Sequence, residues 1–178
     1  MELLTALGLA IPAGLSAYIP LLAVAIAERL DWIRLDAPYS LLGEWWAIAL
    51  VGVLLVVEVV ADKVPAVDHA NDVVQTFVRP VAGGLVAAAA TSGSHYIHPA
   101  VMIVAGILLA GGVHAVKATA RPVINATTAG VGAPVTSTLE DIAAAVMSVL
   151  AILVPVAAAL LGIALIIWLV SWWRRRRA

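Results

Sequence analysis

Cysteine is absent from the 178 residues of this chain, so disulfides, thiolate metal sites and cysteine nucleophiles are excluded. Charge is scarce, because charged residues make up 12% of the chain against about 25% in a typical soluble domain. The phosphate-binding loop Gly-x-x-x-x-Gly-Lys-Ser/Thr is missing, as are the hydrolase motifs His-Glu-x-x-His and Gly-x-Ser-x-Gly. We therefore expect no ATP-driven pumping, no enzyme activity and no cofactor.

Apolar residues are abundant. They make up 63% of the chain, and the mean hydropathy is +1.07. A soluble protein of this size could not bury that much apolar surface, and a disordered chain or a basic nucleic-acid binder has a different composition. The composition predicts an all-α, polytopic integral membrane protein whose partners are membrane lipids and not nucleic acid.

A membrane-spanning helix needs about 20 apolar residues. Residues 3–27 are uncharged but contain Pro12 and Pro20, which predict a kinked or broken helix. Residues 118–137 are rich in Thr, Gly and Pro and suggest a polar stretch between spans. We predict five or six membrane segments, some of them kinked or re-entrant. The number is open because residues 142–173 form either one long kinked helix or a short segment followed by a full span. The other apolar segments are 45–61, 81–91 and 101–116.

A basic end follows the last apolar segment. Trp168, Trp172 and Trp173 precede four consecutive arginines at 174–177. Tryptophan favours the membrane interface and arginine favours the cytoplasmic side, so we expect a cytoplasmic C-terminus. The prediction is a single transmembrane domain at 1–173 with a basic tail at 174–178, multi-pass in a bacterial inner (plasma) membrane.

Two segments resemble each other, which suggests an internal repeat. Each has polar residues at i, i+3 and i+7 followed by proline, a spacing that places the three side chains on one helix face. We expect each proline to kink or end its helix. The two sets are Asp72, Gln75, Arg79 and Pro80, and His114, Lys117, Arg121 and Pro122.

The acidic candidates begin with Glu58, which lies 13 residues after Trp45, about 20 Å along a helix. A carboxylate at that depth must be paired, protonated or facing water. Asp62 follows one turn later on the same face, and the two predict a site for a cation or a proton. Alternatively, the helix ends near Glu58 and both acids lie in headgroup water.

Asp68 and Asp72 extend the acidic candidates in a polar stripe that ends at Arg79. If the stripe faces inward, both acids are ion-binding residues and Arg79 is a counter-charge. Alternatively, the stripe is the solvated face of an amphipathic helix on the membrane surface.

The basic stripe consists of residues predicted as counter-charges or as an anion-binding set. Its alternative role is purely structural, since it could pair with the acidic stripe in a salt-bridge network that only fixes packing. Its members are His114, Lys117, Arg121 and Asn125.

A polar loop is predicted before the last apolar stretch, with Ser137 or Thr138 as the N-cap of the following helix. This loop is either re-entrant, with its backbone lining a wet cavity, or an ordinary external loop. Its candidate site residues are Thr127, Thr128, Glu140 and Asp141.

The sequence resembles a bacterial integral-membrane family of unknown function, the domain-of-unknown-function family 4126. The resemblance implies a membrane location and one domain, with no established activity. More distantly, 58–63 is similar to the Glu-x-Gly-Asp-Lys-Thr motif of a divalent-cation exchanger family. Here the acids are four apart instead of three and the Gly and Thr are absent, so no metal is assigned. The motifs that carry the family resemblance are Gly14-Leu-Ser-Ala-Tyr18-Ile-Pro20, Glu58 to Lys63, Arg79-Pro80, Arg121-Pro122 and Thr128-Ala-Gly130.

The leading hypothesis is a small transporter or channel-like protein with an intramembrane polar site for a cation or proton. The alternatives are a protein that binds or handles a lipid or anionic group, and a structural or assembly subunit without a ligand. The small size of the chain favours a homo-oligomer.

Overall fold

A computed structural model describes residues 2–63, 65–128 and 132–175 of the chain. Within these residues the protein contains seven α-helices, one short 3-10 helix and no strand, which confirms the all-α class. The elements are α1 (Glu2–Ala13), α2 (Tyr18–Arg29), η1 (Tyr39–Gly43), α3 (Trp45–Ala61), α4 (Pro65–Ala90), α5 (Pro99–Thr127), α6 (Gly132–Leu153) and α7 (Pro155–Arg175).

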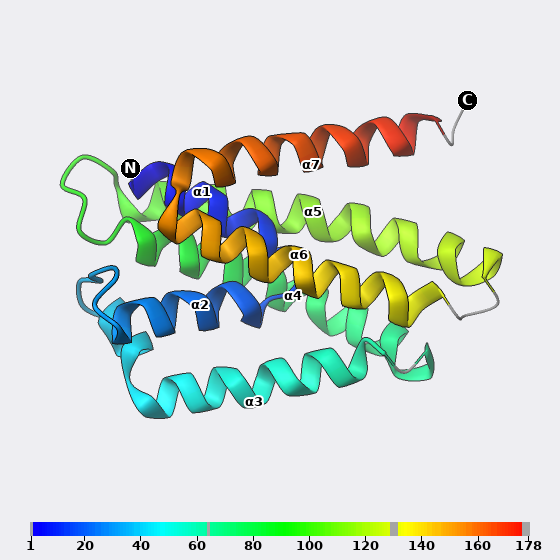
Figure 1. Ribbon diagram of the computed structural model, residues 1–178, viewed down its shortest axis with the longest axis horizontal. Helices are drawn as coiled ribbons and strands as arrows, with labels where there is room; N and C mark the ends of the chain where they lie inside the picture. The colour runs from blue at the N-terminus through cyan, green and yellow to red at the C-terminus, as the bar shows by residue number, and fades with distance from the viewer. Residues whose placement is uncertain (1, 64, 129–131, 176–178) are drawn as a thin grey trace.

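α1 and α2 form a helical hairpin that enters the bundle from one end and returns to it (Figure 1). Glu2 lies near Gly93 at that end, whereas Gly14 touches Ala110 in the middle of α5. The break expected within 3–27 is present at residues 14–17. Because the two halves run in opposite directions, however, this segment does not form the single span that its length allowed.

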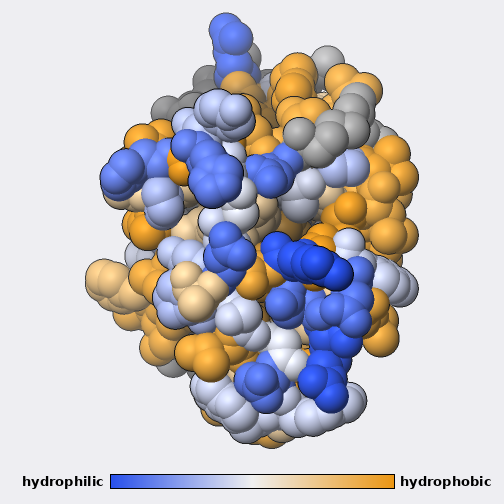
Figure 2. Space-filling model, turned by 90° about the vertical axis from the view of Figure 1, so that its left-hand side faces the viewer, coloured by the Kyte–Doolittle hydropathy of each residue, from blue (hydrophilic) through white to orange (hydrophobic). Residues whose placement is uncertain are grey.

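α3 to α7 run lengthwise and alternate in direction (Figure 1). The end that holds the N-terminus therefore also holds residues 30–44, residues 91–98 and the α6–α7 junction at Val154. The C-terminal end of α7 lies at the opposite end, with the α3–α4 and α5–α6 connections. Seen from the N-terminal end, the molecule shows hydrophilic side chains flanked by hydrophobic ones (Figure 2).

α4 and α5 make the most extensive helix pair of the structure. A Cβ atom on Gly106 would collide with the backbone of Gly83, so glycine is needed for this close approach. Both helices continue through Pro80 and Pro122. Of the two outcomes expected at these prolines, a kink or an end of the helix, the end is wrong, because packing against neighbouring helices holds the chain helical where local preference would break it.

The connection between α5 and α6 is shorter than the polar composition of 118–137 predicted. α5 extends to Thr127 and α6 already begins at Gly132. Ser137 and Thr138 are therefore not N-caps, and the Thr138 hydroxyl donates to the Pro134 carbonyl within the helix. Hydroxyl side chains that bond the preceding turn are compatible with a helix, which composition alone did not reveal.

Three helical segments are long and apolar enough to cross a membrane, namely Asn71–Ala90, Pro99–Ile124 and Gly132–Leu153. The number of crossings, predicted as five or six, and the single-domain prediction stay predictions. The apolar stretch 142–173 is split at Val154 between α6 and α7. α7 continues to Arg175, beyond the predicted start of the basic tail at 174.

Candidate functional site

Charged side chains from four helices meet inside the bundle in what we call the ionic cluster. Three of the four helices, α4, α5 and α6, contain the segments that are long enough to cross a membrane. The most enclosed members have side chains that are at most 2% exposed, and they are Glu58, Asp62, Arg79 and Lys117. The cluster consists of Glu58 and Asp62 from α3 and its C-cap, Asp72 and Arg79 from α4, Lys117 and Arg121 from α5, and Glu140 from α6.

Glu58 connects the cluster to the tip of the α1–α2 hairpin. The Ser16 hydroxyl donates to its Oε2 over 2.6 Å, and the Ala17 backbone N–H donates to its Oε1 over 3.1 Å. The Arg79 guanidinium donates to the same Oε1 over 3.2 Å. The break in the helix thus presents free N–H and hydroxyl donors at the start of α2, where a negative charge is favoured.

Asp62 is the most connected acid of the cluster. One of its oxygens, Oδ2, lies 3.4 Å from Arg79, 3.4 Å from Lys117 and 3.0 Å from Arg121. Its other oxygen accepts from the Asn71 amide over 2.7 Å. Three cations around one carboxylate compensate the cost of removing it from water.

Lys117 ties the hairpin to α6. Its ammonium group donates to the Leu15 carbonyl over 2.8 Å and lies 2.8 Å from the Glu140 carboxylate. Arg121 also reaches Glu140, over 3.4 Å, and lies 3.6 Å from Asp72. The unwound hairpin tip therefore offers a donor to an acid and an acceptor to a base of the same cluster.

His114 lies beside the cluster in a defined protonation state. Arg79 has only donors, so the His114 Nδ1 that lies 3.0 Å from its Nη1 must be an acceptor. His114 Nε2 lies 3.1 Å from the Thr76 hydroxyl, which itself donates to the Asp72 carbonyl. The geometry therefore assigns a neutral imidazole with its proton on Nε2.

The two similar segments pack against each other in antiparallel register. Asp72 at the start of one faces Arg121 at the end of the other, and Arg79 faces His114. The two pairs lie seven residues apart on both helices. The internal repeat suggested by the two segments stays a prediction.

Several predicted site residues lie apart from the ionic cluster. Asp141 pairs with Lys63 over 3.5 Å near the end of the bundle. The Thr127 and Thr128 hydroxyls bond to carbonyls of their own helix, α5. The predicted polar loop is therefore wrong as a unit, since Glu140 and Asp141 lie inside α6 and the Thr residues close α5. The side chains of Asp68 and Asn125 lie outside the described residues.

Sequence reasoning missed the hairpin contacts of Leu15, Ser16 and Ala17. The prolines and Gly14 indicated a break, and a break always leaves backbone donors and acceptors without helical partners. What the sequence did not reveal is that these free groups meet Glu58 and Lys117, because nothing local encodes a contact between residues 41 to 102 positions apart.

The cluster is poorly suited to hold a metal ion. Among the described residues, no group of three or more His, Asp or Glu side chains is arranged to hold one. Each cluster acid instead faces Lys or Arg. The described cluster has four acids against three bases, an excess of one negative charge.

No curated protein and no solved structure matches the chain. A family match covers nearly the whole chain, residues 3–176. Together with three helical segments able to cross a membrane, the match places the protein in a family with no assigned activity. The chain belongs to the family described as a domain of unknown function (DUF4126).

Proposed function

We propose that the protein is a small membrane transporter that moves a proton or a small cation by way of the ionic cluster. The observation that carries the proposal is the bonding of Glu58 both to the hairpin tip and to Arg79. Ionisable residues at membrane depth are costly and are by default part of a functional site. The proposed protein acts without a cofactor, catalyses no covalent reaction and works as a homo-oligomer.

The proposed topology has α3 to α7 crossing the membrane and the α1–α2 hairpin re-entering from the N-terminal end. By the positive-inside rule, the arginine-rich C-terminus is cytoplasmic in the inner membrane. Arg79 then lies 8 residues after Asn71 and 11 before Ala90, the ends of the apolar segment of α4, about 12 Å and 17 Å along the helix. This depth supports a site well below both headgroup layers.

A proton fits the cluster better than a metal ion. Protonation of Glu58 would remove its charge and weaken its bond to Arg79, while Ser16 can turn its hydroxyl and accept from the acid. Since Glu58 and Lys117 both hold the hairpin tip, a change in protonation is coupled to the position of the hairpin. Such coupling suits a carrier in which one element moves against a fixed bundle.

A purely structural salt-bridge network is the main competing explanation. Such a network is expected to satisfy its buried polar atoms, because an unsatisfied one costs about 1–3 kcal/mol. In the described part of the chain, two atoms of the ionic cluster are buried without a hydrogen-bond partner, Arg79 Nε and Asp72 Oδ1, the latter 3.6 Å from the Arg121 guanidinium. Gln75 Oε1 and Ser137 Oγ, outside the cluster, are buried in the same way. These atoms without partners favour a functional site over a purely structural salt-bridge network. The lipid- or anion-binding alternative is less favoured, because Lys117 and Arg121 face acids.

The test is proton flux in liposomes that contain the purified protein and a trapped pH-sensitive dye. We expect Glu58→Gln to lower the flux by at least about tenfold, as expected when an essential proton-transfer group is lost. Glu44→Gln, which changes an exposed acid at the N-terminal end, is the matched control and should leave the flux unchanged. Equal fluxes for Glu58→Gln and the unmodified protein, or no flux above empty liposomes, would overturn the proposal.

A further inference from the structure

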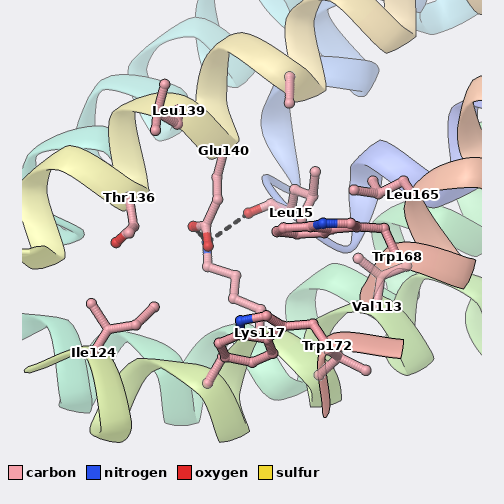
Figure 3. A pocket seen from close by; sticks show the side chains of 13 residues that line it. Leu15, Val113, Lys117, Ile124, Thr136, Leu139, Glu140, Leu165, Trp168 and Trp172 are labelled. Carbon is pink, nitrogen blue, oxygen red and sulfur yellow. Dashed lines mark hydrogen bonds and ion pairs between the residues drawn. The ribbon is translucent and has the colours of Figure 1, made fainter. Parts of the chain in front are cut away.

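A cavity of about 260 Å³ lies between α5, α6 and α7, next to the ionic cluster (Figure 3). Its walls are mostly apolar, and α7 contributes the indole rings of Trp168 and Trp172. The side chains of Leu139 and Trp168 are 61% and 59% exposed, so the cavity opens on the side of the bundle. In the proposed topology this opening lies beside Trp168 and Trp172, at the depth where tryptophan meets the membrane interface.

The polar wall of the cavity is the ion pair between Lys117 and Glu140, whose side chains point toward each other across it (Figure 3). The Glu140 side chain is 22% exposed, whereas that of Lys117 is 2% exposed. A molecule in the cavity therefore meets the Glu140 carboxylate and the indole rings of Trp168 and Trp172. Aromatic faces and a carboxylate both attract cations.

Glu140 can turn toward a ligand while Lys117 and Arg121 keep other partners in the cluster. Lys117 keeps the Leu15 carbonyl at 2.8 Å and Asp62 at 3.4 Å if Glu140 turns away. Arg121 keeps Asp62 at 3.0 Å. Since the described cluster already has one more acid than bases, an added positive charge at Glu140 balances it, whereas an added anion increases the imbalance.

A second cavity of about 260 Å³ continues the first along α5 and α7 and shares Val113 and Val116 with it. It is lined by aliphatic residues and glycine. α7 packs mainly on α1 and α6, which leaves this space between α5 and α7. Together the two cavities offer room for a bulky apolar group beside a single acidic position.

We propose that the cavity between α5, α6 and α7 binds an amphipathic organic cation, with its charge at Glu140 and its apolar groups between Trp168, Trp172 and the aliphatic walls. This inference rests on the proposed function, because it names the class of substrate that the proposed proton-coupled carrier would exchange. Entry from the lipid side suits a molecule that partitions into the membrane before it binds.

The test is equilibrium binding of radiolabelled tetraphenylphosphonium to the purified protein in detergent, with tetraphenylborate as an anion of the same shape. We expect the cation to bind and the anion to bind at least about tenfold more weakly, because only the cation pairs with Glu140. Glu140→Gln should weaken cation binding by about tenfold or more. Trp45→Ala, an exposed indole at the N-terminal end, is the control and should not change it.

Ala143→Phe provides a second variant that fills the cavity without changing a charge, and it decides the matter if Glu140→Gln does not fold. Equal binding of the two probes, no binding of the cation, or unchanged affinity in Ala143→Phe would overturn the inference. The binding assay needs no transport. Cation binding without proton flux would therefore refute the proposed function alone, and proton flux without cation binding would refute the ligand class alone.

Discussion

Arg29 and Arg79 are both arginines, but Arg29 is exposed and Arg79 is buried. Arg29, at the exposed N-terminal end, lies over the Trp45 ring at 4.8 Å from its centroid. Arg79 is completely buried and bonds to Glu58, Asp62 and His114. The comparison shows that the residue type does not decide the role of a charge. An exposed charge is solvated and nearly independent, whereas a buried charge depends on every partner around it.

The largest expected effect is at Arg79. Arg79→Gln leaves Glu58 buried without its cation and should cost about 3–5 kcal/mol of unfolding free energy, whereas Arg34→Gln at the exposed end should cost less than about 0.5 kcal/mol. Unfolding in mixed detergent micelles, followed by circular dichroism, measures both. Similar values for the two variants would mean that the buried pairs carry no more stability than solvated charges, and the comparison would fail.

An intermediate effect is expected from glycine at the hairpin tip. A Cβ atom on Gly14 would lie 2.5 Å from the Ala110 carbonyl oxygen and 2.6 Å from Val113 Cβ, so Gly14→Ala should cost about 1–3 kcal/mol. Gly52→Ala in α3 meets nothing within 4 Å and should stabilise the helix by about 0.5–1 kcal/mol. The same unfolding measurement separates them. A neutral Gly14→Ala would show that the tip is not held tightly against α5.

The smallest effect is expected at Arg29 itself. Arg29→Ala removes the contact with the Trp45 ring and should cost about 0.5–1 kcal/mol, while proton flux in liposomes stays unchanged. Arg29→Lys retains a cation and serves as the control. A clear loss of flux in Arg29→Ala would extend the functional site to the N-terminal end and remove the distinction between the two ends.

Sequence reasoning predicted the helical class, the break near Pro12 and the start of α3 at Trp45, because apolar runs, prolines and interfacial tryptophans are local features. It also singled out the acids and bases that the structure brings together, because charge is conspicuous in an apolar helix. It failed at Pro122, where a kink or an end was expected and the helix does not end, and at Ser137 or Thr138, where an N-cap was expected. Packing against neighbouring helices keeps α5 helical through Pro122. In α6 the Thr138 hydroxyl bonds to the Pro134 carbonyl of its own helix.

The sequence by itself determined that the chain is helical, suited to a membrane and sparing with charge, since composition and apolar run length follow directly from the residues. Only the tertiary structure decided that the first apolar segment turns back as a hairpin and that its free backbone groups bind Glu58 and Lys117. The reason is physical. A buried charge is stable only with partners, and those partners come from helices far apart in the sequence, whose arrangement depends on the packing of the whole bundle.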